Sequence, residues 1–187
     1  MSRSRNVGAQ QATTEYIAFL DDDDFWLPEY LEHTLKLFAE DPEVGAVVGA
    51  LHYCGTNGVQ RPYKRFPPTR EAQRGVYYRN PGIGGNLAIK RKLFIMLGGF
   101  DPSLPASVDR DLAARMLQVD AKIACSPTSI AVRCDHEGDR VRGSQVRANR
   151  LFIVKHWRHM RWPERYKACR TFILRWWLYK VMGHIPR

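Results

Sequence analysis

The residues best suited to chemistry in this chain are four consecutive aspartates, Asp21, Asp22, Asp23 and Asp24. Neighbouring unit charges about 4 Å apart repel by about 1 kcal/mol in water and about 4 kcal/mol near a protein surface. Such a cluster is therefore costly unless it is fully solvated or holds a cation. Apolar residues at 17–20 and 25–27 flank it and disfavour full solvation. Because Mg²⁺ and Mn²⁺ prefer carboxylate oxygens, the cluster predicts a site for one of these ions.

The aspartates directly follow residues 16–20, an apolar run that predicts a buried strand. In extended backbone the first and third aspartates point to one side of the sheet, and the second and fourth point to the other. Ligands of open α/β sheets bind at the carboxyl ends of strands, which is where this cluster lies. The alternative is an acidic turn before a helix that begins near Pro28, where the helix dipole favours negative charge.

Strand-like and helix-like segments alternate along the chain, which predicts an α/β fold. We expect strands at residues 16–20, 44–53, 86–89, 121–125 and 129–133, and helices at 28–41, 91–97 and 109–119. Gly98 and Gly99 are typical of a left-handed helix end. The expected inward residues are Leu31, Leu35 and Phe38 on the first helix and Leu112, Met116 and Val119 on the third. Residues 55–82 are rich in Gly, Pro and Arg and predict a long loop.

Basic residues are concentrated at the C-terminal end. The chain has 29 Lys and Arg against 19 Asp and Glu, and residues 139–187 contain 13 of the bases but only two of the acids. Residues 145–187 look helical, with an interruption at Pro163, and carry four of the five Trp. We therefore expect a catalytic domain at 1–144 and a basic helical tail at 145–187.

Such a tail could lie on an anionic membrane surface, although the bases of residues 164–182 do not gather on one helix face. The alternative is that Leu151, Phe152 and Val154 pack on the sheet while the bases are solvated.

Composition narrows the class of protein. With 187 residues and 44% hydrophobic content, the chain predicts one ordinary soluble domain and excludes a disordered or collagen-like protein. No run approaches the roughly 18 apolar residues of a spanning helix. Residues 1–16 have no apolar run after their basic residues, and the four cysteines lack zinc or CxxC spacing. We expect a cytoplasmic protein with reduced thiols.

Three blocks of residues, in order, resemble family 2 glycosyltransferases, which have the GT-A fold. The first is RNVG at 5–8 with EYIAFLDDDDFWLP at 15–28, the second is GGFD at 98–101 with DRDL at 109–112, and the third is HEGDRVRGS at 136–144. The resemblance covers residues 3 to about 160. It implies a partial GT-A fold, with a mixed sheet flanked by helices and a basic C-terminal helical extension.

The resemblance also implies roles for individual residues. Asp109 matches the general base that deprotonates the acceptor hydroxyl, although by itself it could simply cap a helix. Asp21 and Asp23 match the two acids of a DxD motif, Asp23 as the direct metal ligand and Asp21 as a contact to the metal shell or the donor ribose. His136 matches a position that in some members approaches the metal or diphosphate, but a lone His is more often a polar loop residue.

The remaining implied contacts belong to the substrates. The donor side comprises Arg5, Asn6, Asp21 and Asp22, and the acceptor side comprises Trp26, Gly85 and Asn86. The implied activity is a metal-dependent, inverting transfer of a sugar from a nucleotide-sugar donor to the hydroxyl of a glycan or lipid-linked acceptor. One carboxylate takes the acceptor proton, and Mn²⁺ or Mg²⁺ neutralises the departing diphosphate. A lipid-linked acceptor would place the protein peripherally on the inner face of the membrane.

Two features depart from the family pattern. Val108 stands where the family usually has Glu, and the chain starts after the βαβ portion that recognises the nucleotide base. We therefore expect a fragment, a mis-started reading frame or half of a split enzyme whose partner chain supplies the N-terminal half. Its first strand would have an unpaired edge. The isolated chain would bind donor nucleotide weakly or not at all.

Other functions remain open from the sequence. One alternative is an inactive truncated remnant. Another is a binding module whose tail holds a membrane or nucleic-acid phosphate surface while the acids are structural. A metal-dependent nuclease also uses clustered aspartates but leaves the second and third blocks unexplained, and we expect no specific nucleic-acid partner.

Overall fold

The computed structural model describes residues 2–55, 58, 60–80, 82–134 and 143–182. The strands are β1 (Tyr16–Phe19), β2 (Asp24–Trp26), β3 (Val44–Cys54), β4 (Gln60–Lys64), β5 (Leu87–Lys90) and β6 (Lys122–Cys134). The α-helices are α1 (Ser2–Gln11), α2 (Tyr30–Glu40), α3 (Arg70–Gln73), α4 (Arg91–Met96), α5 (Val108–Gln118), α6 (Gly143–His156) and α7 (Trp162–Met182). Two short 3₁₀ helices, η1 (Arg74–Tyr77) and η2 (Trp157–His159), complete the described structure.

The strands form one mixed sheet in the order β1-β5-β3-β6-β2, with β4 paired to β3. The pairing of β3 with β6 is parallel, and the other pairs are antiparallel. β3 is buried along its first eight residues because it lies in the middle of the sheet. Among the described strands β1 pairs with β5 alone, so its other edge has no strand partner, as expected.

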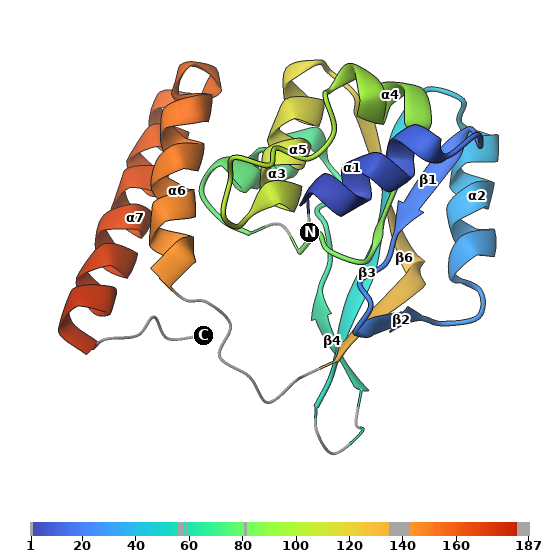
Figure 1. The fold of residues 1–187 in the computed structure, drawn as a ribbon, viewed down its shortest axis with the longest axis horizontal. Helices are drawn as coiled ribbons and strands as arrows, with labels where there is room; N and C mark the ends of the chain where they lie inside the picture. Colours follow the sequence, from blue (N-terminus) through green and yellow to red (C-terminus); the bar gives the residue numbers. More distant parts are fainter. Residues whose placement is uncertain (1, 56–57, 59, 81, 135–142, 183–187) are drawn as a thin grey trace.

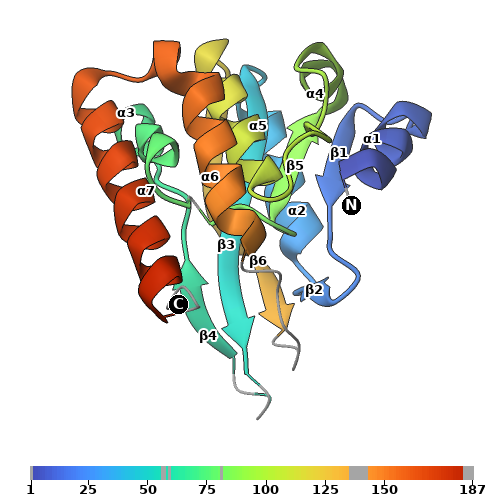
Figure 2. The ribbon, with the colours of Figure 1, turned by 60° about the vertical axis from the view of Figure 1, so that its left-hand side comes forward.

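Helices cover both faces of this sheet (Figures 1 and 2). α2 packs on one face, where Phe38 meets Val44 and Val47 of β3. α1, α4, α5 and α6 pack on the other face and enclose the main core, which includes Phe94, Leu112 and Phe152. The acidic turn between β1 and β2 therefore lies at the end of a sheet that is packed on both faces.

Two of the expected strands, residues 121–125 and 129–133, are a single strand. β6 pairs with β3 on both sides of an irregularity, where Gly49 is opposite Ser126 and Ala50 is opposite Ile130. The Ser129 amide donates to Ser126 Oγ at 2.9 Å and closes this bulge. A Cβ at Gly49 would lie 2.3 Å from the Ser129 carbonyl oxygen, so the bulge requires glycine there. The apparent gap in the sequence was a bulge.

The inner face predicted for α2 was wrong. Leu31 and Leu35 are 48% and 49% exposed, and only Phe38 of the predicted set is buried. The helix is rotated because Tyr30 stacks on Trp26 with ring centroids 4.5 Å apart, and Thr34 donates to Ser129 Oγ at 3.0 Å. Tyr30 and Thr34 therefore face the sheet, where the hydrophobic pattern predicted Leu31 and Leu35.

Other expectations also need correction. Residues 55–82 contain β4, α3 and η1 rather than one long loop. Val119 is 48% exposed rather than inward, and Val154 is 70% exposed rather than packed on the sheet. Pro163 lies in the first turn of α7 and does not interrupt the helix, because a proline there leaves no hydrogen bond unmade. The break between α6 and α7 comes earlier, at η2.

The C-terminal helices are anchored to the body. Phe152 of α6 is fully buried in the main core. Glu164 of α7 accepts from Arg74 Nε at 2.5 Å and Nη2 at 2.7 Å, and also from the Arg161 amide at 2.7 Å. The division at residue 144 stays a prediction, but the segment after it is packed and oriented by specific contacts.

Candidate active site

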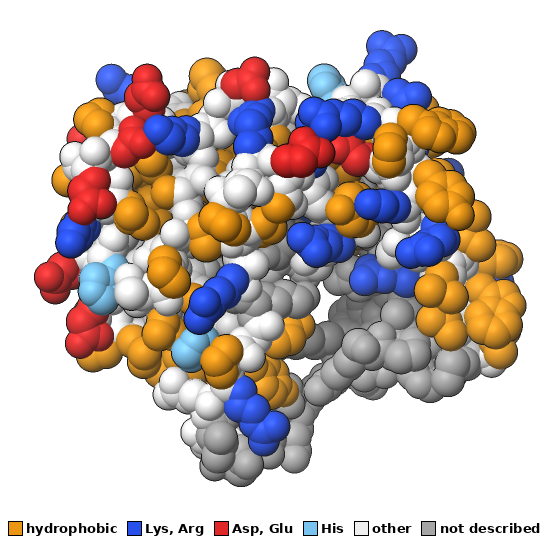
Figure 3. Space-filling view, turned by 180° about the vertical axis from the view of Figure 1, so that it is seen from behind, with side chains coloured by type: hydrophobic (Ala, Val, Ile, Leu, Met, Phe, Trp, Pro, Cys, Tyr) orange, Lys and Arg blue, Asp and Glu red, His pale blue; other side chains and the backbone are white. Residues whose placement is uncertain are grey.

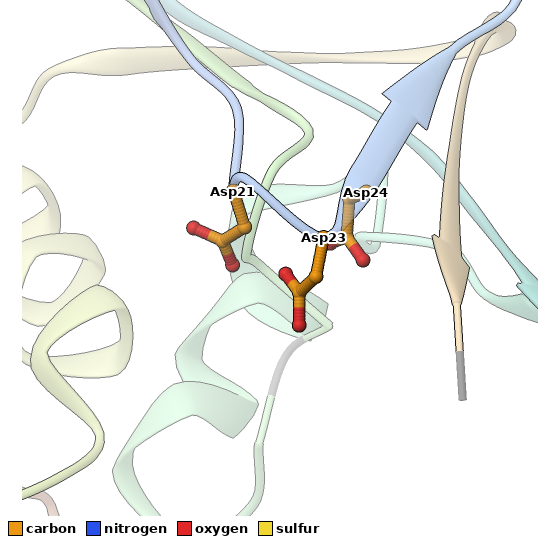
Figure 4. A group of neighbouring side chains, drawn as sticks. All are labelled: Asp21, Asp23 and Asp24. Atoms are coloured by element: carbon orange, nitrogen blue, oxygen red, sulfur yellow. The ribbon is translucent and has the colours of Figure 1, made fainter. Parts of the chain in front are cut away.

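The four aspartates turn back on themselves between β1 and β2. The Asp24 amide donates to the Asp21 carbonyl at 3.2 Å, which bends the backbone before β2 begins. Carboxylate oxygens of Asp21, Asp23 and Asp24 consequently lie within 4.8 Å of one another, and they project to the same side of the turn (Figure 4). The predicted alternation, which placed the fourth aspartate on the opposite side, was wrong because the turn replaces extended backbone. Asp22 is exposed and lies outside this group.

The crowding of carboxylates affects the pKa of Asp24. Burial raises its pKa to about 6, and the charges of Asp23 and Asp21 act in the same direction. The Cys134 amide donates to its Oδ1 at 3.2 Å and opposes the rise. A divalent cation between the three carboxylates would relieve the repulsion, and three oxygen ligands suit Mg²⁺ or Mn²⁺. The donor set therefore fits the predicted metal, with Asp24 as a third candidate ligand that the sequence did not identify.

Arg5 joins the acidic turn to Asp109. Its guanidinium pairs with Asp21 and donates from Nη1 to Asp109 Oδ1 at 3.2 Å. The Arg5 side chain is only 12% exposed and lies 5.3 Å from the Phe100 ring centroid. Asp109 thus contacts a side chain 104 positions away in the sequence, and the same guanidinium also holds Asp21.

Asn6 holds the helix that carries Arg5. Its side chain donates from Nδ2 to the Phe100 carbonyl and accepts from the Phe100 amide, both at 2.8 Å. Gly98 and Gly99 have φ values of 78° and 69°, as the predicted helix end requires. A Cβ at Gly99 would lie 2.6 Å from Asn6 Oδ1, so glycine permits this contact. The amide of Asn6 is thereby occupied in docking α1 on the loop after α4.

Asp109 is the second residue of α5. Ser107 is the N-cap, so the alternative that Asp109 itself caps the helix was wrong, although it does lie in the first turn. Burial raises the pKa of Asp109 to about 6, Arg5 opposes that rise, and Asp21 adds to it. Its side chain is 25% exposed. A half-buried carboxylate of this kind is suited to accept a proton near neutral pH.

α5 is fixed by the two residues that follow Asp109. Asp111 is fully buried, accepts hydrogen bonds from Arg115 Nε and His156 Nε2, both at 2.8 Å, and pairs with Lys155 Nζ at 2.8 Å. Arg110 is 7% exposed and donates to two backbone carbonyls of η1 and to Asn149. Sequence reasoning assigned no role to these residues, because every partner except Arg115 lies 33 to 45 positions away.

The residues predicted for the acceptor lie beside the acidic turn. Trp26 Nε1 donates to the Gly85 carbonyl at 2.6 Å. A Cβ at Gly85 would lie 3.4 Å from both the Asp21 amide nitrogen and Asp24 Oδ2. Asn86 is fully buried, and its side chain bonds the backbone of Gly49, Gly82 and Gly84. Asn86 thus fixes the loop that presents Gly85.

One predicted ligand, His136, lies outside the described residues. Among the described residues, the structure brings Asp21, Asp23, Arg5 and Asp109 into one region, with Trp26 and Gly85 against the turn.

The family model described as "Glycosyl transferase family 2" matches residues 1–100, more than half of the chain. The chain belongs to glycosyl transferase family 2. The match contains the first block and residues 98–100 of the second, and the family assignment and GT-A fold class are confirmed.

Two curated relatives are similar to this family 2 chain over about two thirds of its length. One, from Haemophilus influenzae, is named an uncharacterized glycosyltransferase and is 29% identical over 120 residues, covering 63% of this chain and 40% of the relative. The other, from Haloferax volcanii, is a glucosyl-dolichyl phosphate glucuronosyltransferase, 26% identical over 132 residues, covering 66% and 41%. The chain thus matches about two fifths of the length of these relatives.

Solved structures share the fold. S. aureus TarS (residues 1–349), in complex with UDP-GlcNAc, superposes with a TM-score of 0.61 at 21% identity, covering 83% of this chain and 46% of that one. The mannosyltransferase PcManGT from Pyrobaculum calidifontis, in complex with GDP-Man and Mn²⁺, gives a TM-score of 0.59 at 20% identity, covering 100% and 56%. At this level of identity the similarity establishes the fold alone.

Proposed function

We propose that this family 2 chain catalyses, alone or as part of a longer protein or complex, inverting sugar transfer from a nucleotide-sugar donor to a hydroxyl acceptor. The observation that carries the proposal is Arg5, which pairs with Asp21 on the acidic turn and with Asp109 on α5. A carboxylate able to accept a proton and a cluster able to hold a cation therefore share one region. Inverting transfer needs these two functions together.

Asp109 is the proposed general base. Its pKa of about 6 leaves it ionised at neutral pH, yet basic enough to take a proton as the acceptor oxygen attacks the sugar. Arg5 keeps the carboxylate oriented and opposes the rise in its pKa. Val108, where the family usually has Glu, is buried and apolar and cannot accept a proton. Asp109 is therefore the carboxylate proposed for this role.

Asp21 and Asp23 are the proposed metal ligands, with Asp24 as an additional candidate. Bound Mn²⁺ or Mg²⁺ would supply the positive charge that stabilises the departing nucleoside diphosphate. The Mn²⁺ in the mannosyltransferase structure supports a divalent ion at such a site. His136 stays a proposed contributor from the residues that follow β6.

The substrates are proposed by class. Arg5, Asp21 and Asp22 would contact the donor, while Asn6, predicted as a donor contact, would hold α1 in place for them. The complexes of the two structural neighbours with UDP-GlcNAc and GDP-Man support a nucleotide-sugar. The indole of Trp26 and the backbone at Gly85 would contact the acceptor, with Asn86 holding that loop in place. A lipid-linked acceptor is supported by the name of the glucosyl-dolichyl phosphate relative. The protein would then act in the cytoplasm, on the inner face of the membrane.

Transfer assays on Asp109 test this proposal. The protein is supplied with Mn²⁺, UDP- and GDP-sugars and lipid-phosphate acceptors, and release of nucleoside diphosphate is measured. Asp109→Asn should reduce kcat by about 100-fold to 10,000-fold, because the amide accepts no proton. Asp120→Asn is the matched control, since Asp120 is 86% exposed at a left-handed position that asparagine tolerates. Equal turnover by the two variants would reject Asp109 as the base, and no turnover by the unmodified protein would favour a binding module or inactive remnant.

A further inference from the structure

Helix α7 carries a row of large apolar side chains exposed to solvent. Trp162, Tyr166, Ile173 and Trp177 are 75%, 61%, 61% and 52% exposed. Their spacing of 4, 7 and 4 residues places all four on one side of the helix. The row, defined as these four residues, is about 22 Å long at the rise of an α-helix.

The opposite side of α7 is fixed to the body of the protein. Glu164 and Ala168 are 6% and 2% exposed. Glu164 accepts hydrogen bonds from Nε and Nη2 of Arg74, and Arg161 pairs with Glu71 at 3.0 Å just before the helix. These contacts set the rotation of α7, so the row faces outward as a consequence of the fold.

Basic side chains accompany the row. Residues 143–182 contain ten Lys and Arg and one acid, Glu164, which is already paired. Lys180 follows Trp162 by 18 residues, five full turns, and therefore lies on the line of the row. Arg170 lies between Tyr166 and Ile173 on the same side and is exposed. Figure 3 shows hydrophobic and basic side chains gathered together on the side of the molecule formed by α6 and α7.

We infer that the row on α7 is the surface by which this protein docks on an anionic phospholipid membrane. Trp and Tyr rings favour the headgroup level of a bilayer, while Arg and Lys beside them reach anionic headgroups. A helix with this pattern lies in the plane of the interface rather than crossing it. In the described part of the chain, no helix combines the length and apolarity needed to span a bilayer.

The same features disfavour other occupants. Two copies of the chain joined through their rows would have to bury Arg170, which lies near the middle of the row, and burial of an unpaired charge is unfavourable. Proteins bind nucleic acid chiefly through Lys and Arg side chains that neutralise its phosphates, whereas the row on α7 is mainly apolar. This inference rests on the proposed function only in placing the site near a lipid-linked acceptor; the docking itself needs neither metal nor donor.

Vesicle co-sedimentation tests the inference without any assay of transfer. The full chain is mixed with vesicles of phosphatidylcholine alone or with 30% phosphatidylglycerol, and the bound fraction is measured at low and high salt. The test variant is Trp162→Ser, Ile173→Ser, Trp177→Ser. The matched control is Leu31→Ser, Leu35→Ser, Val119→Ser, which removes three apolar side chains that are 48%, 49% and 48% exposed elsewhere.

The protein should bind the anionic vesicles, and raised salt should weaken that binding. The α7 variant should bind them at least about tenfold more weakly, because its apolar contacts with the interface are lost. The control variant should bind as the unmodified protein does. Equal binding by the two variants, or no binding by the unmodified protein, would overturn the inference. A dimer in solution that only the α7 variant dissociates, without vesicle binding, would assign the row to a second copy instead.

Discussion

Asp109 is subject to opposing influences on its pKa. Burial and the charge of Asp21 raise the pKa, whereas Arg5 lowers it, and the balance is about 6. The carboxylate can work as a base only when ionised, so its protonation below this value removes activity. The pairing of Arg5 with Asp109 therefore helps to set the pH range in which the site is active.

The pH profile of turnover should report this value. At saturating Mn²⁺, kcat should fall by about tenfold for each pH unit below about 6 and should level off above it, because only ionised Asp109 accepts a proton. Nucleoside diphosphate release between pH 5 and pH 8 measures the profile. Arg5→Gln removes the influence that lowers the pKa and should move the midpoint to higher pH. A rate that is flat from pH 5 to pH 8 would contradict the assignment.

At the scale of elements, a buried network joins α5 to α6. His156 Nε2 donates to Asp111 Oδ1 at 2.8 Å, and its Nδ1 accepts from Gln118 Nε2 at 2.8 Å. Burial lowers the pKa of His156, whereas the hydrogen bond with Asp111 opposes this change. Folding therefore favours the neutral imidazole, and the network positions the helix that presents Asp109.

The network predicts how stability depends on pH. A histidine whose pKa is lowered by folding binds a proton more readily in the unfolded chain, so the free energy of unfolding should decrease as pH falls below about 6.5. His156 should therefore account for part of the stability that is lost between pH 7.5 and pH 5.5.

Urea unfolding of the unmodified protein and of His156→Gln at both pH values measures this contribution. The variant should be less stable at pH 7.5 but should lose less stability on acidification. Carboxylates common to both proteins, including Asp109 and Asp24, cancel in this difference. An identical loss in both proteins would show that His156 does not carry the effect.

At the scale of the whole molecule, local patterns predicted most of the fold. β1, β3 and β5 lie within a residue or two of their predicted positions, because each is a short apolar run bounded by turn residues. The bulge in β6 and the rotation of α2 escaped prediction, because both depend on Ser129, which meets Gly49 and Thr34 only in the folded protein. In both cases a tertiary contact determines the structure, and the spacing of hydrophobic residues in the sequence does not reveal it.

The candidate site could likewise be predicted from the sequence only in part. The acidic cluster and Asp109 stood out in the sequence, since consecutive aspartates and an acid at a helix start are local features. The third carboxylate of the cluster did not, because a turn brings Asp24 back toward Asp21. The anchoring of α5 through Asp111 and His156 depends on contact between residues 45 positions apart. Exposure of the row on α7 also required the fold, since it depends on which side of the helix packs against η1.

The central claim is that the acidic turn holds a divalent cation, and Mn²⁺ binding followed by electron paramagnetic resonance tests it most directly. Asp23→Asn removes a proposed ligand, while Asp22→Asn makes the same change of charge at an exposed residue outside the carboxylate group. We predict one Mn²⁺ per chain, bound at least about tenfold more weakly by Asp23→Asn than by Asp22→Asn, because Asp23 supplies a ligand oxygen. Absence of Mn²⁺ binding by the unmodified protein, or equal weakening by the two substitutions, would contradict the claim.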